Sequence, residues 1–188
     1  MAVRPIRITG DPVLHAPAVP VTAFDGDLRE LIEDLFETMD LAPGVGLAAP
    51  QVGVPLRVFT YAWTGEDGVR VRGVAINPVL WISPVPAGVP DEDDESEGCL
   101  SFPGERFALR RAESAILQAQ DADGASYELR ADGWLARILQ HEYDHLDGVL
   151  YTNRLDYDDQ RAVAKITRKR GWGVPGRSWM PGVEHPEG

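Results

Sequence analysis

The chain has 188 residues, of which 44% are hydrophobic and 26% charged, so it is long enough to bury the core of one soluble globular domain. Its net charge of −12 argues against a general nucleic-acid-binding protein, and no run approaches the roughly 20 apolar residues of a membrane span. The N-terminal stretch lacks the apolar core of a signal peptide and there is one cysteine, so we expect a cytoplasmic protein without disulfide bonds.

The first half of the chain is expected to hold one helix and two strands. Apolar periodicity predicts a helix over residues 25–40, because six apolar side chains share one face: Leu28, Leu31, Ile32, Leu35, Phe36 and Met39. The glycine-rich stretch 42–53 should be neither a regular helix nor a central strand. Strands are predicted over 56–63 and 69–80, and residues 83–98 should form a loop that includes the acidic run 91–95.

The second half is expected to hold a hairpin and two helices. Strands over 114–120 and 126–131 flank the turn signal DADG. Asp132 should then cap a helix that ends at Gly148, and a last helix should cover about 156–170. Strands first, with helices at the flanks, predict an α+β fold rather than a doubly wound sheet. We expect residues 1–170 to form a single domain and residues 171–188 a Gly/Pro-rich tail.

The helix around LQHEYDHLDG carries a metal-binding pattern. At about 100° per residue, His141 and His145 share one face and Glu142 flanks them, near enough to handle the proton of a bound water. Asp144 should lie beside His141, where it could accept a hydrogen bond and orient the imidazole. A catalytic site needs a third ligand, and Cys99 in EGCLSFPG is plausible. Two solvent-facing histidines and a buried, inert cysteine remain the alternatives.

The stretch GVGLAAPQVG, residues 44–53, suits a close approach to a ligand. It lacks the lysine of a phosphate-binding loop, which argues against nucleotide binding. Its glycines allow the backbone to approach a ligand, and Gln51 offers a neutral amide donor for a developing oxyanion. Taken alone, such a stretch is more often a structural turn.

The three segments GVGLAAPQ, EGCLS and HEYDH, in this order, resemble the signature motifs of the peptide deformylases, and the similarity extends over about residues 6–155. The resemblance implies mixed or antiparallel sheets packed around a central HExxH helix, with an N-terminal and a C-terminal helix. It also implies a metal-dependent hydrolase that removes the N-formyl group from the formylmethionine of nascent polypeptides and releases formate. An HExxH zinc peptidase and a non-catalytic deformylase-like binding protein stay open as alternatives.

The resemblance also implies roles for individual residues. The metal ligands would be Cys99, His141 and His145. The catalytic groups would be Glu142 as the proton carrier, with the Gln51 amide and the Leu100 N–H holding the oxyanion. The substrate would contact the Gly46 backbone and a methionine pocket formed by Val45, Trp134, Arg137 and Ile138. Glu97 would pair with Arg111 as structural support, and the stem of Arg137 should pack in the pocket while its charged head reaches water.

Ligand chemistry and charge suggest the cofactor and the partners. Cys/His/His ligation suits several divalent metals; the resemblance implies Fe²⁺ in the cell, with Zn²⁺, Ni²⁺ or Co²⁺ in a preparation. Residues 161–170 hold five basic residues and no acid, which predicts either a solvated surface helix or a contact with the ribosome, as in some deformylases. No membrane and no specific DNA partner is expected.

Overall fold

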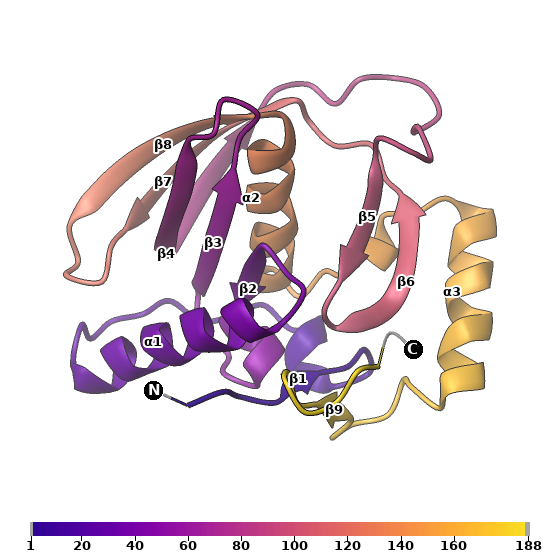
Figure 1. Cartoon of the computed structure of the whole chain (residues 1–188), viewed down its shortest axis with the longest axis horizontal. Coiled ribbons are helices and arrows are strands. Elements are labelled where there is room, and N and C mark those ends of the chain that lie inside the picture. The colour runs from indigo at the N-terminus through magenta and orange to yellow at the C-terminus, as the bar shows by residue number, and fades with distance from the viewer. Residues whose placement is uncertain (1, 187–188) are drawn as a thin grey trace.

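A five-stranded antiparallel sheet and a small two-stranded hairpin enclose the central helix of the computed structural model, which describes residues 2–186 (Figure 1). The elements are β1 Ile6–Arg7, α1 Gly26–Leu41, β2 Gly46–Ala48, β3 Val58–Thr64, β4 Arg70–Ile82, β5 Ser96–Cys99, β6 Phe102–Ala108, β7 Ser114–Gln120, β8 Ser126–Asp132, α2 Gly133–Leu146, α3 Tyr157–Arg170 and β9 Ser178–Trp179, with short 3₁₀ turns at Pro12–His15, Ala49–Val52 and Tyr151–Asn153. The predicted α+β fold is confirmed.

The sheet has the strand order β2-β3-β4-β7-β8, and every pairing in it is antiparallel. Both predicted strand pairs are present. The predicted strand over 69–80 is two residues short, because β4 continues to Ile82, so the predicted loop starts where β4 ends. The loop prediction is wrong at its other end, because β5 begins at Ser96. The glycine-rich stretch also holds more structure than expected: Gly46–Ala48 forms an edge strand and Ala49–Val52 a 3₁₀ turn.

Helix α1 covers one end of the sheet, as its apolar pattern predicts (Figure 1). Five of the six predicted apolar side chains are buried, and Phe36 is partly buried against them. The Asp25 carboxylate accepts a hydrogen bond from Leu28 N at 3.1 Å and caps the helix. The apolar face therefore joins the main core, which contains residues of β2, β3 and β4.

Helix α2 lies between the sheet and the β5–β6 hairpin (Figure 1), which is why ten of its fourteen residues are buried. The helix begins where it was predicted, with Asp132 as the N-cap residue. The Asp132 side chain, however, makes no capping hydrogen bond among the described residues. Gly148, at φ +73°, follows the last turn as predicted. A Cβ there would lie 2.7 Å from Ala16 N, so glycine allows the N-terminal segment to pack closely.

Two short strands, one near each end of the chain, pair with each other. Strands β1 and β9 pair antiparallel, with Ile6 opposite Trp179, and Trp179 is buried in the main core. The described part of the tail, 171–186, thus packs on the rest of the protein, while the domain boundary at residue 170 stays a prediction. Helix α3 begins at the predicted place, where the Asp156 side chain accepts from Asp159 N at 3.0 Å. Within residues 2–186, no helix is both long and apolar enough to span a membrane.

Candidate metal centre

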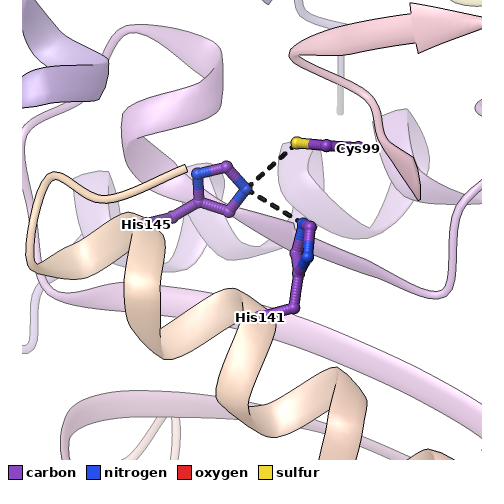
Figure 2. A group of neighbouring side chains, drawn as sticks. All are labelled: Cys99, His141 and His145. Carbon is purple, nitrogen blue, oxygen red and sulfur yellow. Dashed lines mark hydrogen bonds between the residues drawn. The ribbon is translucent and has the colours of Figure 1, made fainter. Parts of the chain in front are cut away.

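Three side chains from two elements converge at the predicted metal site (Figure 2). His141 and His145 come from one face of α2, and Cys99 ends β5. The His145 Nε2 atom lies 3.2 Å from His141 Nε2 and 3.4 Å from Cys99 Sγ, and one ligand atom from each residue falls within 4.8 Å of the others. All three residues are buried. Two imidazole nitrogens and a sulfur at these separations suit a single tetrahedrally ligated divalent ion with one position left for water.

Glu97 of β5 orients one of these imidazoles. Its Oε1 atom lies 2.6 Å from His141 Nδ1, so the ring donates from Nδ1 and keeps the Nε2 lone pair for a metal. The predicted pair with Arg111 is present, with hydrogen bonds of 2.9 and 2.6 Å to the two carboxylate oxygens. Burial opposes ionisation of Glu97, but the charge and hydrogen bonds of Arg111 outweigh it and hold the pKa of Glu97 well below its usual range.

Asp144 has a different partner from the one predicted. It was expected to orient His141, but its carboxylate bonds Arg111 at 2.7 Å and Arg154 at 2.6 and 2.7 Å. The prediction was wrong because Glu97 reaches the imidazole from the hairpin. Asp144 therefore ties α2 to Arg111, and Arg111 in turn holds Glu97.

Arg137 also differs from expectation. Its guanidinium is largely buried: Nη1 donates to Leu109 O at 2.6 Å and to Glu97 Oε2 at 3.1 Å, and the residue is 9% exposed. Its planar cation lies 5.2 Å from the centre of the Trp134 ring. Arg137 thus lines the cavity while it neutralises the carboxylate behind His141.

Glu142 lies beside the histidines and against Gly46. A Cβ built on Gly46 would overlap Glu142 Oε1, so only glycine lets β2 approach this carboxylate. Burial raises the pKa of Glu142 to about 7, although the neighbouring His141 charge opposes the shift. The Oε2 atom is buried and finds no hydrogen-bond partner in the part of the chain described, so it can exchange a proton with a molecule in the site.

The Gln51 amide is fixed with its NH₂ group toward Cys99. Ala48 N donates to Gln51 Oε1 at 2.8 Å, while Gln51 Nε2 lies 3.3 Å from Ser101 Oγ and 3.7 Å from Cys99 Sγ. The 3₁₀ turn that carries Gln51 packs against α2, so the glycine-rich stretch presents its amide to the metal ligands.

A cavity of about 550 Å³ opens onto this centre. All the residues predicted for the site line it except the buried His145. The lining includes Val45, Gly46, Gln51, Cys99, Leu100, Trp134, Arg137, Ile138, His141 and Glu142. The cavity is also lined by Trp63 of β3, which was not predicted from the sequence. The Trp63 ring stacks on Trp134 with centroids 6.0 Å apart. The rim residues Glu105 and Arg106 were not predicted either. The sequence around Trp63 on its strand carries no pattern that indicates contact with Trp134 on a helix far along the chain.

Comparisons with known proteins agree with this site. The family model described as polypeptide deformylase matches residues 3–161. Peptide deformylases from Mycolicibacterium smegmatis and Rhodococcus opacus are 53% and 51% identical, over 97% and 100% of this chain and 96% and 98% of theirs. The solved peptide deformylase from Thermus thermophilus is similar with a TM-score of 0.74 and 40% identity, over 89% of this chain and 94% of that chain. The peptide deformylase from Ehrlichia chaffeensis, solved in complex with actinonin, is similar with a TM-score of 0.76 and 33% identity, over 90% of this chain and 98% of that chain. The chain therefore belongs to the peptide deformylases, the family of metal-dependent enzymes that act on formylated N-termini.

Proposed function

We propose that this enzyme hydrolyses the N-formyl group of formylmethionine at the start of nascent polypeptides and releases formate. The observation that carries the proposal is the convergence of Cys99, His141 and His145 at a cavity also lined by Glu142 and Gln51. Each of these residues then has a role in the hydrolysis of one amide. A general HExxH peptidase would leave the Gln51 amide and the Cys99 thiolate without an evident use.

Cys99, His141 and His145 would hold one divalent ion. We propose Fe²⁺ in the cell, and Zn²⁺, Ni²⁺ or Co²⁺ in preparations, because thiolate and imidazole ligands accept all four. Such an ion supplies a Lewis acid that lowers the pKa of water and polarises the formyl oxygen. The fit rests on the buried donor set and on Glu97, which fixes the His141 tautomer.

Glu142 is proposed as the proton carrier. Its carboxylate takes a proton from the water that attacks the formyl carbon and then delivers a proton to the leaving amine. A raised pKa suits both steps, because a group with a pKa of about 7 exchanges protons readily near neutral pH. A cation on the neighbouring histidines would favour the ionised carboxylate before the water attacks.

Gln51 and Leu100 are proposed to stabilise the negative oxygen that forms during the attack. The Gln51 amide is held by Ala48 N and aims its NH₂ group toward Cys99. The Leu100 N–H follows Cys99 directly in the chain, and Leu100 lines the same cavity. Neutral donors that are fixed before reaction stabilise such an oxyanion without competing for the metal.

The methionine side chain is proposed to lie among Val45, Trp134 and Ile138, with the Gly46 backbone beside the peptide. Trp63 extends this apolar wall through its stack on Trp134. Arg137 would contribute its aliphatic stem, because its guanidinium is bonded to Glu97 and to the Leu109 carbonyl. A thioether then meets apolar carbon rather than a charged group.

We also propose a cytoplasmic enzyme that contacts the ribosome through α3. The bases Arg161, Lys165, Arg168, Lys169 and Arg170 are all exposed on this helix. Arg170 Nη2 lies 3.3 Å from Glu105, which lines the cavity rim, so the basic end of α3 neighbours the cavity. Contact with polyanionic RNA at this helix would bring the cavity near emerging chains.

Formate release tests the proposed function. Protein freed of metal and reloaded anaerobically with Fe²⁺, Ni²⁺ or Zn²⁺ is assayed on formyl-Met peptides and on the same peptides with acetylated N-termini. We expect formate from the formyl peptides and no acetate from the acetylated peptides, with internal amide bonds left intact. Cleavage of internal bonds would instead support a peptidase, and tight peptide binding without formate release would support a binding protein.

A further inference from the structure

The carbonyl of Leu100 is held by a residue from the far end of the chain. Trp179 Nε1 donates to Leu100 O at 2.9 Å. Trp179 is 4% exposed and lies on β9, whose pairing with β1 fixes its position. An indole N–H is a donor only, so a buried tryptophan needs an acceptor, and here the acceptor lies in the loop that carries Cys99.

This hydrogen bond acts on a peptide group that also touches the Cys99 sulfur. Leu100 O and Ser101 N belong to the same planar peptide unit, so fixing one atom fixes the direction of the other. At the opposite edge of this unit, Ser101 N donates to Cys99 Sγ at 3.4 Å. The indole, the peptide and the thiolate therefore form a chain of two hydrogen bonds from the tail to the metal ligand.

The N-terminal segment holds the next carbonyl of the same loop. Thr9 N donates to Ser101 O at 2.9 Å, and the Thr9 carbonyl accepts a hydrogen bond from Gly173 N of the tail at 3.0 Å. Both ends of the chain thus restrain the two residues after Cys99. Packing alone would explain a buried Trp179, but it would not require an indole N–H directed at this carbonyl.

We propose that Trp179 is a positioning residue for the metal centre: its indole N–H holds the Leu100–Ser101 peptide so that Ser101 N–H donates to the Cys99 thiolate. Hydrogen bonds in series strengthen one another, so a carbonyl that accepts from the indole makes the N–H of its peptide a better donor. An N–H donor on a ligating thiolate withdraws electron density from sulfur and tunes the metal it binds. The inference rests on the proposed role of Cys99 as a ligand.

The test compares cobalt-loaded wild-type protein with Trp179→Phe, which keeps an aromatic ring in the core and removes the donor. Loss of the donor should leave the thiolate richer in electrons, so its charge-transfer absorption to Co²⁺ should move to longer wavelength. With Fe²⁺ or Ni²⁺, kcat for a formyl-Met peptide should fall about fivefold, the scale of one lost hydrogen bond, while KM stays within about twofold.

Trp172→Phe is the matched control. Trp172 is another tryptophan of the tail, and its ring packs edge-on against Phe102 with centroids 5.0 Å apart. This variant should lower the melting temperature through lost packing and leave the cobalt band in place. A Trp179→Phe protein with the wild-type band and a lower melting temperature would show that Trp179 only packs, and would overturn the proposal.

A second variant covers the case in which Trp179→Phe fails to fold. The benzothiophene analogue of tryptophan at position 179 keeps the bicyclic ring and lacks the N–H; the same shift of the cobalt band is expected, and an unchanged band overturns the proposal. The band is read without peptide substrate. Wild-type protein that binds cobalt but releases no formate would therefore refute the proposed function and leave this comparison valid.

Discussion

At the scale of single residues, Glu142 is the group on which the proposed chemistry depends most. Its carboxylate is buried beside His141, and Glu142→Gln keeps the size of the side chain while removing the proton acceptor. We expect kcat to fall by about 10²–10⁴-fold, the usual contribution of general acid–base catalysis, with metal content unchanged. Glu128→Gln on exposed β8 is the control and should match wild type. Turnover near the wild-type rate in Glu142→Gln would remove Glu142 from the mechanism.

Gly46 offers a test of how closely β2 must approach that carboxylate. In Gly46→Ala the added Cβ would overlap Glu142 Oε1, so the carboxylate must shift away from its position. Misplacing a catalytic group by about 1 Å can cost about 100-fold in rate, and we expect kcat/KM to fall by at least about tenfold. Gly26→Ala is the control, because a Cβ there meets nothing within 4 Å. Equal activity of the two variants would show that the close approach has no catalytic value.

The sequence predicted which side chains lie together where one local pattern held the information. His141, Glu142 and His145 lie within a single helix, whose periodicity places them together, and the motif order supplied Cys99. The same periodicity misled for Asp144 and Arg137. A helical projection gives the direction of a side chain but not its partner, and both partners here involve Glu97 or Arg111, which lie outside the helix. The metal-ligand, catalytic and substrate roles themselves stay predictions.

At the scale of elements, a buried charge network joins the β5–β6 hairpin to α2. Glu97 belongs to β5 and bonds His141 and Arg137 of α2, and Arg111 joins Glu97 to Asp144. The family resemblance implied the Glu97–Arg111 pair. The predicted loop over 83–98 took in the start of β5, and no strand was predicted for β6, because SEGC and FPGERFA lack the regular alternation of a strand. This network holds the ligand-bearing strand against the ligand-bearing helix.

The network makes a prediction for stability against pH. Glu97 has a folded-state pKa below its ordinary value of 4.5, so its contribution is complete above about pH 4.5 and is lost as pH falls toward the folded pKa. Glu97→Gln should therefore lower the unfolding free energy at pH 7 by about 3 kcal/mol, because it removes one partner from a buried ion pair. The deficit should shrink as pH falls below 4.5.

Urea unfolding of metal-free wild type and Glu97→Gln at pH 7 and near pH 3.5 measures this difference. Glu105→Gln is the control, because that carboxylate makes only a partly exposed pair with Arg170 and should cost little at either pH. A deficit that is the same at both pH values would mean that Glu97 acts through packing rather than through its charge.

At the scale of the whole molecule, the pairing of the chain ends was beyond the sequence. Strands β1 and β9 have two residues each, too few for a periodic pattern, and they are separated by nearly the whole chain. Composition alone made the tail a Gly/Pro-rich extension. The helices and the β3–β4 and β7–β8 pairs were predictable because each has its own local apolar pattern. The pairing of β1 with β9 instead buries Trp179 opposite Ile6, far apart in the chain.

The charge of the whole molecule leads to the last prediction. Helix α3 presents exposed bases on a protein whose net charge is −12. The acidic remainder of the surface should repel a polyanion such as RNA, so any contact with RNA should be made through this helix. Replacing Lys165, Arg168 and Lys169 by glutamate should weaken co-sedimentation with ribosomes at low salt. It should also reduce the slope of log affinity against log salt by about 2 to 3, since three phosphate contacts are lost.

The control for this variant carries the same change in net charge elsewhere. Arg29, Arg70 and Arg130 are exposed on α1, β4 and β8, away from α3 (Figure 1), and their replacement by glutamate should weaken binding much less. Neither variant should change turnover of a short formyl peptide, because the replaced residues lie outside the cavity lining. If both variants lose ribosome binding equally, binding depends only on net charge. If neither variant loses it, α3 is a solvated surface helix whose partly buried Val163 and Ile166 pack inward.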